Sequence, residues 1–185
     1  MKKSIIILLL GLASASNAQD FKFGKVSKEE LQEKAHYKTL ETNAAVLFKK
    51  QYTNFRFSQS DGFTQETKVH ERIKIYNKEG YEWATKRIKL YDESNAKSER
   101  LSGLKGYTYT LLNGKIEKTK LRKENIFEEK SNKYWSTSTF TMPGLTEGCI
   151  VEFEYVIETP FLEIEDVILQ YTIPINNLEV DIVTP

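Results

Sequence analysis

Reactive and metal-binding side chains are scarce in this sequence, which has one cysteine and two histidines among 185 residues. A single cysteine cannot form a disulfide within the chain, so burial of apolar side chains must hold the fold together. Cys149, His36 and His70 lack the close spacing of zinc ligands. No Gly-rich segment leads into a helix that could hold phosphate. The sequence has two acidic groups, one of Asp92 and Glu93 and one of Glu163, Glu165 and Asp166. Both lack the alternating ligands and the turn glycine of a calcium loop. No metal or cofactor is therefore expected.

A long apolar run is also missing. The run Ile5–Leu12 is far shorter than the roughly 20 residues of a membrane-spanning helix. Lys2 and Lys3 precede it and small residues follow it up to Ala18, which is the pattern of a secretory signal peptide. We therefore expect residues 1–18 to be removed by cleavage near Ala18. The mature chain should be periplasmic, secreted or held at the cell surface, and it should not span the membrane.

Charge of one sign does not predominate. The 27 Lys and Arg residues nearly balance the 26 Asp and Glu residues, and the two signs alternate in stretches such as KEELQEK and KIEKTKLRKE. Their fields largely cancel beyond about 10 Å, whereas binding to a polyanion requires a clustered positive surface. The composition therefore argues against nucleic acid as a partner.

Helix signals are few. Ser27 and Glu30 have the spacing of a capping box, in which each side chain accepts a hydrogen bond from the backbone N–H of the other residue. This pattern predicts one short helix over about residues 28–35, and no other helical signal in the chain is as strong.

Alternation with a period of two runs through much of the remaining chain and predicts β-strands. In VHERIKIY, residues 69–76, apolar side chains fall on one face and polar ones on the other, and IVEFEYVIE, residues 150–158, repeats the pattern. Two further strands are predicted at 167–173 and 178–183. Asn113-Gly114 stands between YTYTLL and KIEKTKL and predicts a β-hairpin. The polar stretch 91–103 is interpreted as a loop.

Strands without long helices between them favour an antiparallel β-sandwich over a parallel α/β sheet. The expected fold is therefore all-β, an antiparallel β-sandwich with one short N-terminal helix. Residues 19–185 have the length of a single domain.

The lone thiol is expected to be structural. Counting in twos along its strand places Cys149 on the same face as Val151 and Phe153, which points it into the core. Desolvation there disfavours the reactive thiolate. A catalytic cysteine would also need a histidine base within reach, but His36 falls in a helix-to-strand connection and His70 on the polar face of a strand. No catalytic residue is predicted, and an autonomous thiol enzyme is the least favoured interpretation.

Aromatic residues make up 12% of the chain, and several lie near predicted turns or strands. Trp83, Tyr134 and Trp135 are the candidates for stacking on a ligand, because Trp135 follows the polar run EEKSNKY. Most aromatic residues of an all-β chain instead fill the core or pair across strands. Burial is therefore the alternative for each of these three residues.

The order of several segments resembles an uncharacterised domain family found at the N-terminus of secreted bacterial proteins, directly before a transglutaminase-like domain. The segments are FGKVSKEELQ, HERIKIYNKEG, LKGYTYTLLNGKIEKTKL with IFEE after it, and FTMPGLTEGCIVEFEYVIETP, and the similarity covers about residues 21–185. The resemblance implies a β-sandwich without catalytic residues, whose partner domain carries a Cys-His-Asp constellation beyond Pro185. Cys149 matches no catalytic position of that partner domain. The chain is therefore expected to be the N-terminal part of a longer protein.

Two functions follow as expectations. The first is a noncatalytic N-terminal β-sandwich that accompanies a transglutaminase-like domain, and the alternative is a free-standing carbohydrate- or peptide-binding module outside the cytoplasm. If residues 167–184 normally pack against a following domain, the chain should expose apolar surface there and tend to associate.

Overall fold

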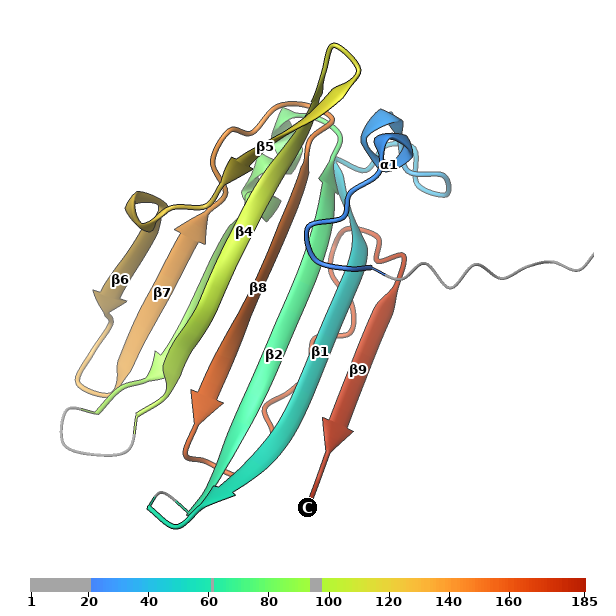
Figure 1. Ribbon diagram of the computed structural model, residues 1–185. Coiled ribbons are helices and arrows are strands. Elements are labelled where there is room, and N and C mark those ends of the chain that lie inside the picture. The colour runs from blue at the N-terminus through green and yellow to red at the C-terminus, as the bar shows by residue number, and fades with distance from the viewer. Residues whose placement is uncertain (1–20, 61, 94–97) are drawn as a thin grey trace, which may run out of the picture.

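The computed structural model describes residues 21–60, 62–93 and 98–185, so the expected signal peptide lies outside the described residues. The fold is an all-β sandwich of two sheets (Figure 1), with strand order β5-β4-β8-β2-β1-β9 in the large sheet and β3-β7-β6 in the small one. Its elements are α1 (Lys28–Gln32), β1 (Ala44–Ser58), β2 (Gly62–Ile75), η1 (Lys78–Ala84), β3 (Thr85–Tyr91), β4 (Arg100–Leu112), β5 (Lys115–Lys120), η2 (Lys123–Asn125), β6 (Ile126–Lys130), β7 (Trp135–Thr141), β8 (Ile150–Thr159) and β9 (Leu178–Val183).

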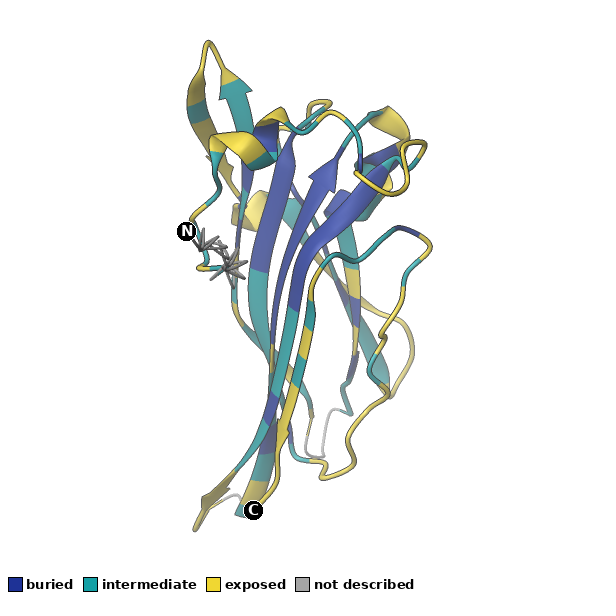
Figure 2. Cartoon of the chain, turned by 90° about the vertical axis from the view of Figure 1, so that its right-hand side faces the viewer, coloured by how far each residue is buried: buried dark blue, intermediate teal, exposed yellow. Residues whose placement is uncertain are grey.

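The main core lies between the two sheets. Phe153 of β8 and Phe140 of β7 are both fully buried, and their rings meet edge to face with centroids 5.2 Å apart. Ile73 of β2 and Val151 of β8 belong to the same cluster. Buried residues gather toward the end of the long strands that carries α1, and burial falls off toward the opposite end (Figure 2). The core therefore closes one end of the sandwich more tightly than the other.

The hairpin predicted at Asn113-Gly114 is confirmed. Strands β4 and β5 pair antiparallel up to the Leu112–Lys115 pair, which leaves a loop of two residues. Asn113 has φ 50° and Gly114 has φ 73°, as a tight hairpin turn between right-handed twisted strands requires.

The N-terminal helix is present but short. Ser27 Oγ accepts from Glu30 N at 3.1 Å, and Glu30 Oε2 accepts from Ser27 N at 2.6 Å, which completes the capping box. The helix ends at Gln32 rather than at residue 35, because Glu33 is extended with ψ 118°. The short 3-10 helix η1 was not predicted, and it begins where Asn77 Oδ1 accepts from Gly80 N at 3.3 Å. None of the helices in the described ranges is long and apolar enough to cross a membrane.

Of the four strands predicted outside the hairpin, three are confirmed and one was wrong. Residues 69–75 lie in β2, and 150–158 lie in β8. Residues 167–173 form no strand but belong to a long connection between β8 and β9. In that connection Ile173 is buried in the core whereas Ile168 is exposed, so a locally apolar run was divided between interior and surface instead of extending a sheet.

The predicted strand at 178–183 is β9, but its pairing departs from the antiparallel arrangement. It lies parallel to β1, with Lys49 opposite Leu178. The connection reaches β1 first through Pro174, whose carbonyl accepts from Val46 N at 2.9 Å. Strand β1 itself was not predicted, since its apolar start AAVLF does not alternate. Strand β1 lies between β2 and β9 in the large sheet.

Candidate functional site

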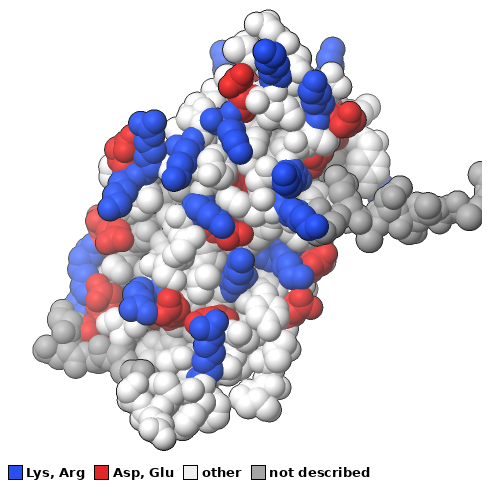
Figure 3. All heavy atoms as spheres, viewed as in Figure 1, with Lys and Arg blue, Asp and Glu red and all other residues white. Residues whose placement is uncertain are grey.

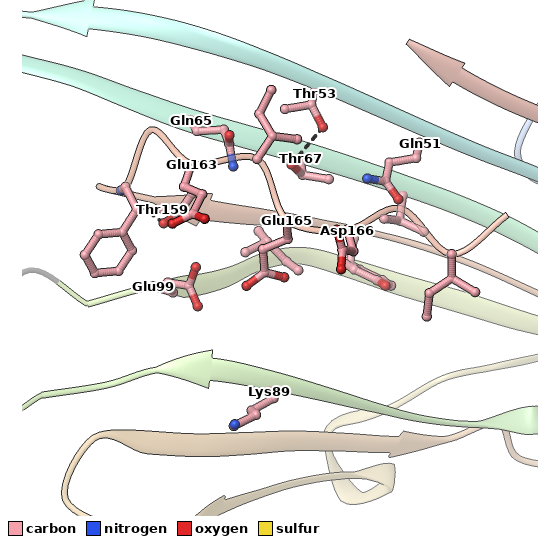
Figure 4. A pocket seen from close by; sticks show the side chains of 16 residues that line it. Gln51, Thr53, Gln65, Thr67, Lys89, Glu99, Thr159, Glu163, Glu165 and Asp166 are labelled. Atoms are coloured by element: carbon pink, nitrogen blue, oxygen red, sulfur yellow. Dashed lines mark hydrogen bonds between the residues drawn. The ribbon is translucent and has the colours of Figure 1, made fainter. Parts of the chain in front are cut away.

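A cavity of about 700 Å³ opens between the sheets at the loosely packed end of the sandwich. One wall is the inner face of the large sheet, contributed by β1, β2 and β8, and the connection after β8 lies across it (Figure 4). Six polar or charged residues that carry its chemistry are Gln65, Lys89, Glu99, Glu163, Glu165 and Asp166. We call this space the acidic cavity.

The inner face of the large sheet changes character along its strands, and this change creates the cavity. Where the small sheet covers it, the face carries Ile73 and Phe153. Further along it carries Thr53, Gln65 and Thr67 instead. Thr53 and Thr67 pair their hydroxyl oxygens at 3.0 Å across β1 and β2. This contact satisfies the fully buried Thr53 hydroxyl, whose burial without a partner would be costly.

Gln65 of β2 is polar and nearly inaccessible. Its side chain lines the cavity and is only 4% exposed, yet its Oε1 has no hydrogen-bond partner among the described residues. An unpaired buried amide oxygen costs about 1–3 kcal/mol. The large sheet therefore holds, beside the cavity, an acceptor closed to solvent that no side chain or backbone group of the described residues uses.

Carboxylates converge on the cavity from two segments. Glu163, Glu165 and Asp166 come from the connection after β8, and Glu99 comes from the residue before β4 (Figure 4). Burial, followed by the negative charge of Glu99, raises the pKa of the Glu165 carboxyl, while Lys89 acts in the opposite direction. The sequence pattern indicated only that Glu163, Glu165 and Asp166 do not form a calcium loop. The fold instead gathers them around one space, although each remains accessible to water.

Two of the three candidate stacking residues come together beside the cavity. Tyr134 and Trp135 both pack on Tyr91, with ring centroids 6.4 Å and 5.5 Å away. Phe161, which lines the acidic cavity, meets the same Tyr91 ring at 5.3 Å. Lys89 Nζ lies 3.9 Å from the centre of the Trp135 ring, so a cation already covers one part of this cluster.

Trp83 is not part of this cluster. It lies in η1, packs against the core and meets Tyr171 with ring centroids 5.4 Å apart. It also lines a second hollow with Thr172 and Pro174. The structure therefore brings Tyr134 and Trp135 together and places Trp83 at a different site.

Cys149 lies where the sequence places it. It is fully buried in the same core cluster as Val151 and Phe153. Burial raises the pKa of its thiol, despite opposing effects of a Thr146 hydrogen bond and the Lys74 charge. Each histidine pairs with another residue: His36 Nε2 lies 2.8 Å from Asn176 Oδ1, and His70 Nε2 lies 2.9 Å from a carboxylate oxygen of Glu152.

A buried network of charged side chains on the outer face of the large sheet was missed by the sequence analysis. Alternation assigned His70, Arg72 and Glu152 to a solvated face, but they are respectively 8%, 1% and 0% exposed. Arg72 donates to Glu152 Oε1 from Nη2 at 2.8 Å and to Glu30 Oε1 from Nη1 at 2.8 Å. Gly24 N and the Tyr109 hydroxyl donate to the other Glu152 oxygen at 2.8 and 3.2 Å.

This network fastens the N-terminal segment, residues 21–33, over the outer face. Burial alone would raise the pKa of Glu152, but the His70 hydrogen bond and the Arg72 charge more than offset it, so that pKa lies below its ordinary value. Lys74, also fully buried, donates to the Leu31 carbonyl at 2.8 Å and to the Gly148 carbonyl at 2.7 Å. The only sequence signal for this cover was the capping box, which placed a helix there without saying what lay beneath it.

Elsewhere on this outer face the charges are mixed. Lysines, arginines and acids are interspersed over the side shown in Figure 3. Glu154, for example, lies 2.8 Å from Lys105 Nζ and 3.6 Å from Lys68 Nζ. Opposite charges at such distances largely cancel one another's field. Across residues 21–60, 62–93 and 98–185, no three His, Cys, Asp or Glu side chains are placed to hold a metal ion.

The fold and cavity define a two-sheet β-sandwich domain with a polar opening at one end. Residues 61–185 match the family described as "Domain of Unknown Function with solved-structure structure (DUF3857)". Since this match extends over more than half of the sequence, the chain belongs to that family.

One solved structure with the same fold comes from Parabacteroides distasonis ATCC 8503 and is named a "putative protease". It shares 17% sequence identity with this chain at a TM-score of 0.60, and the match covers 77% of this chain. The matched region is 29% of that protein, so this chain spans less than a third of its length. No curated protein matches the sequence.

Proposed function

We propose that this sandwich is a noncatalytic domain that packs against a transglutaminase-like catalytic domain of the same polypeptide, outside the cytoplasm. The observation that carries the proposal is a set of exposed apolar residues after β8, which we call the apolar strip. In the described ranges these residues make up seven of the fourteen large hydrophobic residues that are exposed: Phe161, Leu162, Ile164, Ile168, Leu169, Ile182 and Val183.

Exposed apolar side chains favour burial against another protein surface, because each Å² removed from water contributes about 25 cal/mol. Strand β9 adds to this tendency. Among the residues that the structure describes, it is the edge of the large sheet and pairs only with β1. Its other side therefore offers backbone groups that a neighbouring domain can cover. The strip and the edge strand belong to one stretch of sequence, residues 161–183.

Two further features support an accessory role. The Cys149 thiol is enclosed in the core, and both histidines are hydrogen-bonded within the sandwich, an arrangement that suits scaffolding better than nucleophilic catalysis. The protein from Parabacteroides distasonis is much longer than this chain and carries a protease name. A sandwich of this fold can thus be one part of a larger polypeptide.

The gene segment directly downstream of codon 185 tests the proposal. It should encode a cysteine, a histidine and an aspartate in that order, and its product, produced as a separate chain, should co-purify with this domain. Replacing Leu169 and Ile182 together by Asp should weaken that association at least tenfold. Leu112→Asp, at the exposed β4–β5 turn, is the matched control and should leave it unchanged.

Catalysis and export provide independent readouts. Cys149→Ala in the complete polypeptide should keep its hydrolytic or acyl-transfer activity, and loss of activity with an unaltered fold would contradict the noncatalytic assignment. N-terminal sequencing of the exported protein should begin at Gln19. A stop codon at position 186 would overturn the partnership and favour the free-standing module.

That second candidate, a carbohydrate- or peptide-binding module, is favoured by the cluster of Tyr91, Tyr134, Trp135 and Phe161. Tyr134 is 38% exposed and its ring stacks on Tyr91, which suits stacking on a flat ligand. Titration with soluble glycans, monitored by tryptophan fluorescence, should then give saturable changes that Tyr134→Ala abolishes.

A further inference from the structure

We infer that the acidic cavity binds an organic cation, an alkylammonium group carried either by a free amine or by a lysine side chain. The inference goes beyond the domain partnership proposed above and is tested separately from it, although Phe161, Ile164 and Ile168 belong both to the apolar strip and to the lining of the cavity. It rests on three features: unpaired carboxylates, an unused buried acceptor, and an apolar surface next to both.

The carboxylates give the cavity an excess of negative charge. Glu163, Glu165 and Asp166 make no hydrogen bond or ion pair with another residue of the described chain, and Glu99 accepts only a backbone N–H, that of Tyr91 at 2.8 Å. Lys89 is the one cation among the lining residues. Its ammonium group lies over Trp135 at 3.9 Å and forms no ion pair with these acids, so the cavity can accommodate a further positive charge.

Gln65 supplies the second, independent feature. Its side chain lines the cavity and the residue is only 4% exposed, which means that 96% of it is buried. Its Oε1 has no partner in the part of the chain that the structure describes. An ammonium group has three donors and no acceptor. We expect it to donate to a loop carboxylate and, once the Gln65 side chain turns toward the cavity, also to Gln65 Oε1, which is closed to solvent in this structure. Both contacts together would satisfy the buried amide and neutralise the acid.

The remaining lining residues favour an organic cation over a metal ion. The acids do not form a compact ligand set, since no three of them in the described ranges are placed to hold a metal. Tyr155 and Ile157 form an apolar floor on β8, and Phe161 and Ile168 face them from the connection. A cavity of about 700 Å³ with acidic and apolar parts matches an ammonium group at the end of an aliphatic chain.

Three probes test the inference with the purified protein: pentane-1,5-diamine, the peptide acetyl-Gly-Gly-Lys-Gly-Gly-amide, and the same peptide with its lysine acetylated. Binding is followed by calorimetry and by NMR shifts at Gln65, Thr67 and Tyr155. We expect the charged peptide, the diamine or both to bind, and the acetylated peptide to bind at least tenfold more weakly. Binding of both indicates that the ammonium group suffices, whereas binding of only one identifies the source as a free amine or a side chain.

Variants connect the binding to the cavity. Glu163→Gln combined with Glu165→Gln should weaken binding about tenfold or more, because charge-assisted hydrogen bonds are lost, and Gln65→Leu should weaken it about fivefold or more. Glu128→Gln on the exposed strand β6 is the matched control and should change nothing. Glu163 and Glu165 both lie at exposed positions, so the double variant should keep the wild-type circular dichroism spectrum and melting temperature.

Three results would overturn the inference. The first is that neither charged probe binds at concentrations up to 10 mM (about −3 kcal/mol or weaker). The others are that the acetylated peptide binds as tightly as the charged one, or that the folded Glu163/Glu165 double variant keeps the wild-type affinity. Each of these is distinct from failure of the domain partnership, which is decided by the downstream segment and by the apolar strip.

Discussion

At the scale of single residues, the buried charges on the outer face form a network whose members depend on one another. Glu152 accepts hydrogen bonds or ion contacts from Arg72, His70, Tyr109 and Gly24 without exposure to solvent. Such a network stabilises only while all its members are present, because removal of one leaves another charge buried without its partner.

Replacing Glu152 by Gln should therefore destabilise the fold by about 3 kcal/mol. The substitution keeps the size of the side chain but leaves the Arg72 charge with Glu30 as its remaining carboxylate. Urea denaturation followed by fluorescence measures the change. Glu128→Gln, exposed on β6, should shift the free energy of unfolding by less than about 0.5 kcal/mol; a similar small shift in the Glu152 variant would show that the network contributes little.

Lys74 gives stability a defined pH dependence. Burial lowers its pKa from 10.5 to about 8. Between these two values the unfolded chain binds the proton and the folded chain does not, so stability due to this group rises as pH increases from about 8 to about 10.5.

The comparison with Lys74→Met is made with Cys149→Ala in both proteins, because the charges of Lys74 and Cys149 influence each other's pKa. Titration of the buried tyrosines then occurs in both proteins. The free energy of unfolding of the wild type, minus that of the variant, should rise by an amount on the order of 2 kcal/mol between pH 7.5 and pH 10. Denaturation curves at several pH values provide the measurement. A difference independent of pH would mean that Lys74 keeps an ordinary pKa in the folded state.

At the scale of elements, turn and cap residues determined where the hairpin and the helix form. Contacts with other segments determined how far each element extends. Asn113-Gly114 and the capping box at Ser27 and Glu30 were recognised in the sequence and occur as hairpin and helix. The run 167–173 had a strand-like composition, but the chain there crosses from surface to core. The path of that run involves contacts with residues far away in the sequence, such as burial of Ile173 in the core and, directly after the run, the hydrogen bond from Val46 N to the Pro174 carbonyl.

Gly114→Ala should destabilise the β4–β5 hairpin, because Gly114 has φ 73°, where a side chain is strained. The expected cost is about 1 kcal/mol. Amide hydrogen exchange at β5 should accelerate correspondingly. Lys115→Ala, at the next position but with ordinary backbone geometry, is the control, and equal effects of the two substitutions would argue against a conformational origin.

At the scale of the whole molecule, the apolar strip predicts association. Isolated protein at high concentration should form dimers or larger species, because exposed Leu169, Ile182 and neighbouring residues favour burial. Leu169→Asp with Ile182→Asp should shift sedimentation toward the monomer, and Leu112→Asp should not. A wild type that sediments as a monomer at millimolar concentration would contradict this expectation.

The sequence by itself determined the all-β class, the hairpin, the start of the N-terminal helix and the inward direction of Cys149. Each depends on local rules, since periodicity, turn chemistry and capping act between residues close in the chain. Only the tertiary structure decided that His70, Arg72 and Glu152 are buried, that β9 runs parallel to β1, and that acids near residues 99 and 165 line one cavity. Alternation assigns a side chain to a face of a strand, but whether water or another segment covers that face depends on contacts between residues far apart in sequence.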